Sequence, residues 1–166
     1  RDCVDVFTRS SPDTLDASIL PLQPHIDDEL ETVTILGARS QVGHFLRPRL
    51  VGQGYRVVAS SRNPVRSIGL KAVNWRVMDL TDAHETNWPE HVDTVVSLVP
   101  VWLLPGAVEK LAGRGMKRLS AFSSTSRYTK QESDVASEAK LAERLADGEQ
   151  RLTAECTANN VAWTLF

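Results

Sequence analysis

The sequence predicts one α/β domain built on a doubly wound parallel β-sheet, in which helices cover both faces. The chain has 166 residues, about the size of a single domain. From residue 32 onward, short β-branched runs alternate with stretches of helical periodicity, which is the pattern of β-α-β units. Right-handed crossovers between six predicted strands favour the order 3-2-1-4-5-6. That order places a ligand crevice at the carboxyl ends of strands one and four.

Local signals justify each element. β-branched runs between turn residues predict strands, and apolar residues spaced three and four apart predict helices. Pro48 lies inside the first predicted helix and should kink it or fray its end, because proline removes a backbone donor. The fourth strand is apolar enough to be buried on both faces. In order, the signals predict strands at 33–36, 55–59, 73–77, 92–99, 118–123 and 161–166, and helices at 41–53, 64–70, 103–112 and 133–159, with Gly148 as a point where the last could break.

Residues 1–31 differ from the rest of the chain. Pro12, Pro21 and Pro24 interrupt any apolar periodicity, and acidic residues cluster before residue 32. We interpret this segment as an N-terminal extension that is flexible or loosely docked. The alternative is a segment that packs on a partner or on its own domain. The folded domain is therefore expected at 32–166.

Composition excludes several classes of protein. Hydrophobic residues make up 42% and charged residues 24%, which argues against wholesale disorder. A net charge of −2 gives no general reason to bind nucleic acid. The longest mostly apolar run, 95–108, is too short to span a bilayer. Cys3 and Cys156 fit a reducing compartment, so we expect a cytoplasmic protein with no membrane or nucleic-acid partner.

The loop after the first strand carries the clearest motif. Gly37, Ser40 and Gly43 follow the spacing Gly-x-x-Ser-x-x-Gly between a strand and a helix. Gly37 permits a tight turn and Gly43 lets the helix pack close to the sheet, while Ser40 stands where a middle glycine would let the backbone approach a pyrophosphate. The amides at the start of the helix offer a site for an anion. The alternative is an ordinary strand-to-helix turn with two glycines.

The segment 34–43 resembles the Gly-x-x-Gly-x-x-Gly loop of extended and atypical short-chain dehydrogenases/reductases, the NAD(P)-dependent epimerase/dehydratase group. Further landmarks resemble the same family and follow in its order: 60–64 the exit of strand two, 78–82 an Asp-Leu adenine contact, 93–100 strand four, 117–128 strand five with its serine-rich exit, and 161–166 strand six. The resemblance covers 32–166. It implies a Rossmann-like NAD(P)-binding domain without the family's C-terminal substrate-binding part.

The resemblance implies a nicotinamide dinucleotide cofactor. NAD-selective sites place an acid at the end of strand two, whereas this chain has Ser61 and Arg62 there. Arg62, together with Arg39 in the loop, could hold a 2′-phosphate, which favours NADP over NAD. The alternative is that Arg62 is a solvated surface residue. The implied cofactor-binding residues are Gly37, Arg39, Ser40, Gln41, Val42, Gly43, Ser61, Arg62, Asp79, Leu80, Val99 and Pro100.

The catalytic residues implied by the resemblance are incomplete. The family's reductases use a Tyr-x-x-x-Lys pair after strand five, in which the lysine lowers the pKa of the tyrosine. Lys140 matches the lysine, but Ala136 occupies the tyrosine position. Ser124 matches the family's hydroxyl position, with an ordinary serine-rich turn as the alternative. Tyr128 is either a substitute acid or an exposed loop tyrosine.

Two function classes therefore stay open. The first is the NAD(P)-binding domain of an oxidoreductase that acts on a small molecule. The second is a non-catalytic NAD(P)-binding sensor or regulatory module, similar to NmrA-like regulators, and a structural role is a third alternative. The four histidines show no ligand spacing, so no metal site is expected. The sequence leaves the oligomeric state open, with a homodimer among the alternatives.

Overall fold

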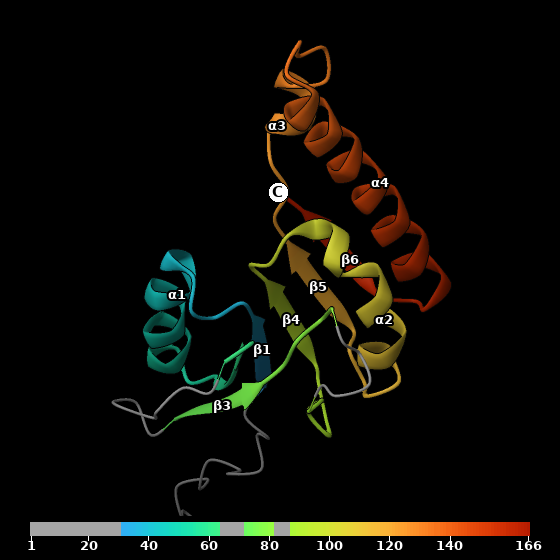
Figure 1. Cartoon of the computed structure of the whole chain (residues 1–166). Coiled ribbons are helices and arrows are strands. Elements are labelled where there is room, and N and C mark those ends of the chain that lie inside the picture. Colours follow the sequence, from blue (N-terminus) through green and yellow to red (C-terminus); the bar gives the residue numbers. More distant parts are fainter. Residues whose placement is uncertain (1–30, 64–71, 82–86) are drawn as a thin grey trace, which may run out of the picture.

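A computed structural model describes residues 31–63, 72–81 and 87–166. Its centre is a six-stranded, wholly parallel sheet in the order β3-β2-β1-β4-β5-β6 (Figure 1). The predicted strand order and the Rossmann-like α/β class are thereby confirmed. Apart from Glu31, the predicted N-terminal extension lies outside the described residues, and so does the predicted helix at 64–70.

The elements follow the predicted succession. The strands are β1 (Thr32–Leu36), β2 (Arg56–Ser61), β3 (Val73–Val77), β4 (Thr94–Ser97), β5 (Arg118–Ala121) and β6 (Ala162–Leu165). The helices are α1 (Gln41–Gly52), the short 3-10 helix η1 (Val101–Leu103), α2 (Pro105–Ala112), α3 (Ser126–Thr129) and α4 (Ala136–Ala158). Helix α1 runs through Pro48 to Gly52.

Helix α4 continues past Gly148 over 23 residues, so the glycine does not break it. A Cβ atom at Gly148 would lie 2.8 Å from Cα of Trp102, so the missing side chain instead lets α4 approach η1 closely. Helix α3 was not predicted, because its four mostly polar residues carry no apolar periodicity.

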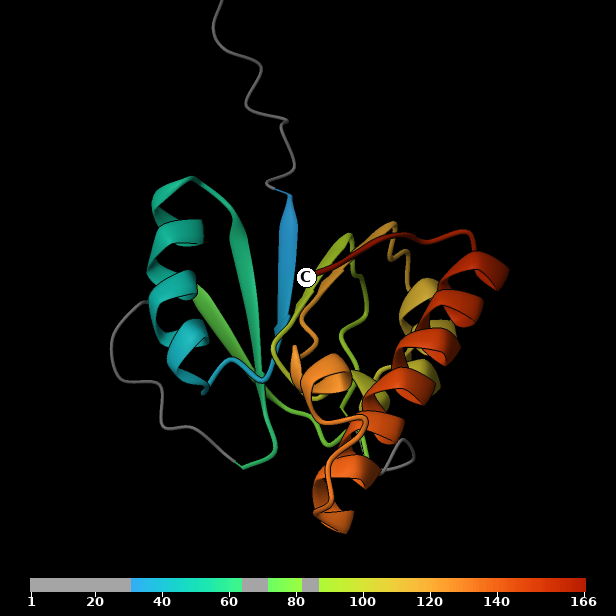
Figure 2. The same ribbon diagram turned by 90° about the horizontal axis from the view of Figure 1, so that it is seen from above.

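Two hydrophobic clusters cover the sheet, one on each face. Helices α2 and α4 lie over one face and α1 over the other (Figure 2). Strand β1 is buried along its whole length. The expectation that the fourth strand is buried on both faces is wrong, because Thr94 and Val96 of β4 are only half-buried. Leu46, Leu50 and Val51 of α1 pack against the buried residues of β1 and β2 on that face.

Cys156 belongs to the cluster beneath α2 and α4 and is completely buried. Burial, together with the negative charge of Glu155, raises the pKa of Cys156 to about 11. The thiol is therefore protonated at neutral pH and acts as a packed apolar group rather than a nucleophile.

Candidate functional site

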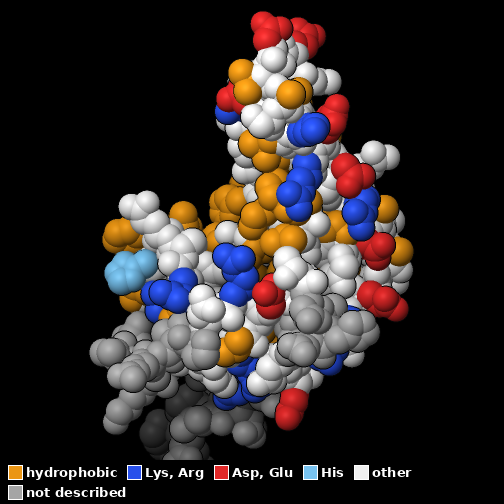
Figure 3. Space-filling view, in the orientation of Figure 1, with side chains coloured by type: hydrophobic (Ala, Val, Ile, Leu, Met, Phe, Trp, Pro, Cys, Tyr) orange, Lys and Arg blue, Asp and Glu red, His pale blue; other side chains and the backbone are white. Residues whose placement is uncertain are grey.

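A crevice of about 520 Å³ lies at the carboxyl ends of β1, β2 and β4. Because these strands are parallel, segments that are far apart in the sequence meet at one edge of the sheet. Figure 3 shows Lys and Arg side chains beside α1 on this side of the molecule, with a hydrophobic area toward α3 and α4. The crevice is lined by Gly37, Arg39, Ser40, Ser60, Ser61, Arg62, Asn63, Met78, Asp79, Leu80, Leu98, Val99, Pro100 and Leu103.

Nine of the predicted cofactor residues line this crevice, which is all of them except three. The exceptions are Gln41, Val42 and Gly43, which form the first turn of α1 directly behind the lining residue Ser40. The N–H groups of Gln41 and Val42 lie at the open end of the helix, where no preceding turn can accept their hydrogen bonds. They are positioned to donate to an anion in front of the helix.

Gly37 occupies a position that only glycine tolerates. Its φ of +73° is in the left-handed region, and a Cβ atom there would lie 2.9 Å from Cγ1 of Val99. The N–H of Leu98 donates to the carbonyl oxygen of Leu36 at 2.9 Å, which holds the two strand exits together. The absent side chain thus keeps the floor of the crevice clear between β1 and β4.

Gly43 is constrained by close packing rather than by its torsion angle. A Cβ atom at Gly43 would lie 2.5 Å from the carbonyl oxygen of Ala38, which is a backbone atom of the loop itself. Ser40 is the N-cap of α1, and its Oγ accepts the N–H of Gly43 at 3.1 Å. The serine in the middle of the motif therefore turns its side chain onto the helix.

The charges at the crevice come from three strand exits, those of β1, β2 and β3. Arg39 and Arg62 are both exposed, and no acid stands at the end of β2, where Ser60 and Ser61 are buried. The N–H and the hydroxyl of Thr81 donate to the Asp79 carboxylate at 3.0 and 2.7 Å. These two hydrogen bonds, with a smaller contribution from the charge of Arg62, lower the pKa of Asp79 below its usual value. Asp79 is thus ionised at neutral pH, and its carboxylate already accepts two hydrogen bonds from Thr81 in its own turn.

A second, smaller cavity of about 170 Å³ lies beyond Pro100, between η1, the end of β5 and α4. Pro100 lines both the crevice and this cavity. Of the three predicted catalytic residues, only Ser124 lines the cavity. Tyr128 is 71% exposed on α3, and Lys140 is exposed on α4; neither lines the crevice or the cavity.

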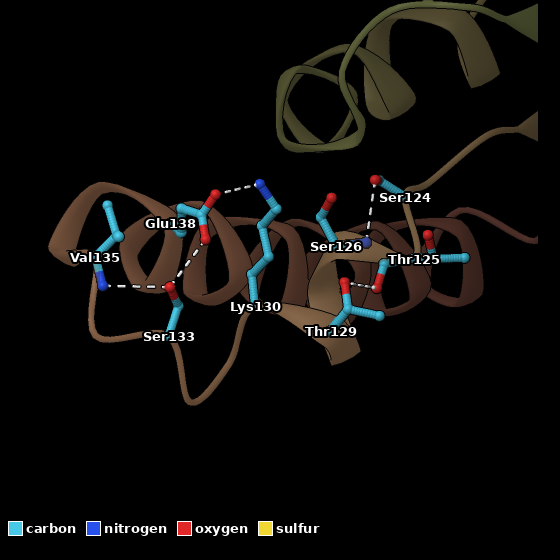
Figure 4. Close-up of polar contacts among 8 residues, drawn as sticks. All are labelled: Ser124, Thr125, Ser126, Thr129, Lys130, Ser133, Val135 and Glu138. Carbon is cyan, nitrogen blue, oxygen red and sulfur yellow. Dashed lines mark hydrogen bonds and ion pairs between the residues drawn. The ribbon is translucent and has the colours of Figure 1, made fainter.

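The loop after β5 is held by local hydrogen bonds (Figure 4). Ser124 Oγ accepts the N–H of Ser126 at 3.2 Å, the kind of bond expected of a serine-rich turn. Lys130 Nζ lies 2.6 Å from Glu138 Oε1, and Ser133 Oγ donates to the other oxygen of Glu138 at 2.8 Å. The side chains of Ser124, Ser126 and Lys130 project on one side of α3 (Figure 4).

Several residues that line the second cavity were not predicted from the sequence. Leu141 and Leu145 face it from α4, and Trp102 and Phe122 complete its apolar walls. Glu149, one further turn along α4, is buried and bonded to the Ser123 hydroxyl and the Arg127 guanidinium. The spacing of four residues along α4 was visible in the sequence. Nothing in it showed which helix face would meet the loop after β5.

Solved structures with the same fold have 14–19% sequence identity to this chain. UDP-galactose 4-epimerase superposes with a TM-score of 0.65 at 17% identity, over 81% of this chain and 54% of the epimerase chain. A short-chain dehydrogenase/reductase superfamily protein from Agrobacterium tumefaciens with bound NAD gives 0.64 at 14% identity, over 81% and 48%. MoeE5 in complex with UDP-glucose and NAD gives 0.61 at 18% identity, over 81% and 52%.

The chain has the fold of these epimerases and dehydrogenases. It spans about half the length of each of the three. No family model matches the sequence, and no curated protein matches it. At this level of identity the similarity shows the fold alone. The function must be inferred from the residues of the crevice.

Among residues 31–63, 72–81 and 87–166, no three His, Cys, Asp or Glu side chains are grouped so that they could hold a metal ion. Within the same ranges, no helix combines the length and the apolar character needed to cross a bilayer.

Proposed function

We propose that this chain is the NAD(P)-binding domain of an epimerase/dehydratase-like oxidoreductase and that it prefers NADP. The observation that carries the proposal is the first β-α turn, where Gly37 and Gly43 have no room for a side chain. This close packing brings the start of α1 against the carboxyl ends of β1 and β4. Dinucleotide pyrophosphates bind at such a helix start in doubly wound sheets.

The other lining residues fit the remaining parts of a dinucleotide. In this proposal the N–H groups of Gln41 and Val42 hold the pyrophosphate, and Asp79 and Leu80 lie beside the adenine. Val99 and Pro100 contact the nicotinamide ribose, and Pro100 also lines the second cavity. A bound nicotinamide would supply hydride transfer. Ser124, at the rim of the second cavity, would donate a hydrogen bond to a substrate oxygen.

The preference for NADP rests on the two exposed guanidinium groups of Arg39 and Arg62 and on the lack of an acid at the end of β2. A 2′-phosphate can accept paired hydrogen bonds from a guanidinium group, whereas an acid would repel it. Two of the solved neighbours named above carry NAD, so the preference is a property proposed from the residues of this chain.

Substitution of Arg62 tests both parts of the proposal. NADPH should raise the melting temperature, because a ligand at a hundredfold excess over its Kd stabilises the folded state by about 2.7 kcal/mol. Arg62→Ala should weaken NADPH binding by about 1.5–3 kcal/mol, the value of a hydrogen bond to a charged group, and leave NADH binding nearly unchanged. Arg56→Ala is the matched control, since Arg56 is exposed at the other end of β2.

Equal losses for NADPH and NADH would show that Arg62 does not contact the 2′-phosphate. No shift of the melting temperature with millimolar NADPH or NADH would contradict the dinucleotide proposal altogether. In that case the structural role becomes the better account of the chain.

One observation favours the second function class, a binding module without turnover. Among the described residues, no titratable side chain lines the second cavity, and α4 presents Leu141 and Leu145 to it. General acid catalysis contributes about 10²–10⁴-fold to a rate, and this wall offers no acid. A screen of carbonyl compounds and sugar nucleotides with NADPH, followed by absorbance, separates the classes. Cofactor binding without turnover supports the module, and turnover abolished by Tyr128→Phe would make Tyr128 the acid.

The same proposal includes a cytoplasmic location, a small-molecule substrate if the domain is catalytic, and no nucleic-acid or membrane partner. It also includes the homodimer as a state to be tested. Sedimentation at micromolar concentration would distinguish a monomer from a homodimer.

A further inference from the structure

The exits of β2 and β3 lie side by side at the crevice, and the sheet ties them together. Ser61 and Val77 are register partners at the ends of the two strands, and the N–H of Met78 donates to the carbonyl oxygen of Ser61 at 2.9 Å. Arg62 and Asp79 follow directly, and both line the crevice. A cation and an acid therefore leave neighbouring strands at the same edge of the sheet.

Both exits are short turns closed by a side chain. The Ser61 hydroxyl oxygen accepts the N–H of Asn63 at 3.3 Å, and Asp79 Oδ1 accepts the N–H and the hydroxyl of Thr81 at 3.0 and 2.7 Å. Each acceptor lies two residues before the amide that it binds, and such local bonds fix a turn. The Asp79 carboxylate and the backbone at Arg62 are thus held in place, whereas the Arg62 side chain is long and exposed.

The two charged groups attract each other. After the hydrogen bonds from Thr81, the charge of Arg62 contributes to the lowered pKa of Asp79. Asp79 is also the one acid among the described residues that line the crevice. The guanidinium of Arg62 therefore has one carboxylate of the crevice within electrostatic reach.

A 2′-phosphate beside these turns changes the balance of charges. The phosphate carries up to two negative charges and can accept paired hydrogen bonds, so it attracts a guanidinium more strongly than one carboxylate does. It must draw Arg62 away from Asp79, and the Asp79 carboxylate repels it. The ribose of NAD carries an uncharged 2′-hydroxyl instead, which leaves the attraction between Arg62 and Asp79 in place.

We propose that Asp79 limits the preference of the crevice for NADP by competing with the 2′-phosphate for Arg62. With NAD bound, the guanidinium lies with Asp79, and with NADP bound it turns to the phosphate. Asp79 is therefore a specificity-determining residue that acts through Arg62. This inference rests on the proposed function and adds to it the residue that sets how far NADP is preferred.

Asp79→Asn tests the competition, because it removes the charge and keeps an oxygen for the two hydrogen bonds from Thr81, both of which go to one carboxylate oxygen. The affinities of the intact chain for NADPH and NADH are measured by titration calorimetry. A lost contact with the adenine would weaken both cofactors equally, so the ratio of the two affinities is the readout. We expect this ratio to rise about three- to tenfold, since an attraction and a repulsion between exposed charges, each worth up to about fivefold, disappear together.

The same substitution in an Arg62→Ala background separates competition from simple repulsion. Without Arg62, only the repulsion between Asp79 and the phosphate is left to remove, so the ratio should rise by no more than about twofold. An equal or larger gain in this background would show that Asp79 acts on the phosphate directly, which overturns the exchange of partners. An unchanged or lowered ratio in Asp79→Asn alone overturns it as well.

Asp147→Asn is the matched control. Asp147 also lies beside an arginine, with Arg151 Nη1 at 3.5 Å, but it is exposed on α4 and does not line the crevice. Its substitution removes the same charge from the chain and should leave the ratio unchanged. A rise as large as that in Asp79→Asn would assign the effect to the net charge of the chain and overturn the proposal.

The melting temperature of each variant without ligand checks that it is folded. Binding of neither cofactor to the wild-type chain contradicts the proposed function and the exchange with it. Binding of both cofactors with equal gains in the two backgrounds contradicts the exchange alone.

Discussion

The crevice at the first β-α turn and the cavity beside α4 lie at the same edge of one sheet, yet they are built differently. The crevice is shaped by backbone, because Gly37 and Gly43 leave no room for side chains between the loop, α1 and β4. The cavity is shaped by side chains from η1, α4 and the end of β5. A site made of backbone leaves a short contiguous signature in the sequence, whereas a site made of distant side chains leaves none.

The two regions also differ in charge. Arg39, Arg62 and Asp79 line the crevice, whereas the cavity has no charged lining residue within the described part of the chain. In both regions, however, a glycine allows a helix to approach its neighbour closely. Gly43 does so for α1 and Gly148 for α4, and substitutions of these glycines compare the two regions directly.

Gly43→Val should have the largest effect. Its Cβ atom would lie 2.5 Å from a backbone oxygen that no side-chain rotation can move. Overpacking costs about 1–3 kcal/mol and occasionally more, so we expect the stability to fall by ~3 kcal/mol or more and the NADPH response to disappear. Urea denaturation measures the first and the melting-temperature shift the second.

Gly52→Ala, in the same helix, is the control for Gly43→Val. No atom lies within 4 Å of the Cβ position at Gly52, and alanine in a helix is more favourable than glycine by up to about 1 kcal/mol. We expect unchanged or slightly raised stability. Equal destabilisation by both substitutions would mean that close packing against Ala38 is not what requires Gly43.

Gly148→Ala should have an intermediate effect that is confined to the second region. Its Cβ atom would lie 2.8–2.9 Å from backbone and Cβ atoms of Trp102, so α4 and η1 must move apart at a cost of about 1–3 kcal/mol. We expect this loss of stability in urea denaturation and a nearly unchanged NADPH affinity.

Gly106→Ala provides the comparison for Gly148→Ala, because Gly106 lies in α2 and has no atom within 4 Å of its Cβ position. It should leave both the stability and the NADPH affinity nearly unaffected. A loss of NADPH affinity in Gly148→Ala as large as that in Gly43→Val would show that the two regions are one cooperative site.

The smallest effect concerns the loop after β5. The Lys130 ammonium and then the Ser133 hydroxyl lower the pKa of Glu138 below its usual value. A carboxylate with a lowered folded-state pKa stabilises the protein above its unfolded-state pKa of about 4.3 and loses this contribution as the pH falls through the folded-state pKa. Glu138→Gln should therefore lower the melting temperature slightly at pH 7, and its effect should shrink as the pH falls below about 4.3.

Glu143→Gln, at an exposed position of the same helix, is the control for the removal of one carboxylate from α4. A difference between wild type and Glu138→Gln that persists unchanged to pH 3 would show that the ion pair with Lys130 is not its source.

The sheet could be predicted because each strand carries its own signal. The β-branched runs mark the strands, and the handedness of the crossovers limits their order, so 3-2-1-4-5-6 followed without any contact information. The ends of β4 were less predictable. Just before β4 begins, the chain bonds to the connection between α2 and β5. There the N–H of Val92 donates to the carbonyl oxygen of Arg114 at 3.0 Å.

On helix α4, the residue that the family motif indicates does not lie on the face that meets the core. The motif points to Lys140, but the face of α4 that meets the core is formed by residues about four apart, among them Leu141, Leu145 and Cys156. Successive residues of a helix are about 100° apart, so Lys140 is exposed although Leu141 lines the cavity.

The sequence alone determined the fold class, the strand order and the glycine-bearing turn, because periodicity, crossover handedness and glycine torsions are local or nearly local properties of the chain. Only the tertiary structure decided which side chains meet beyond Pro100. That cavity depends on the rotation of α4 about its axis and on the distance that Gly148 allows to Trp102, and both are set by packing between segments far apart in the sequence.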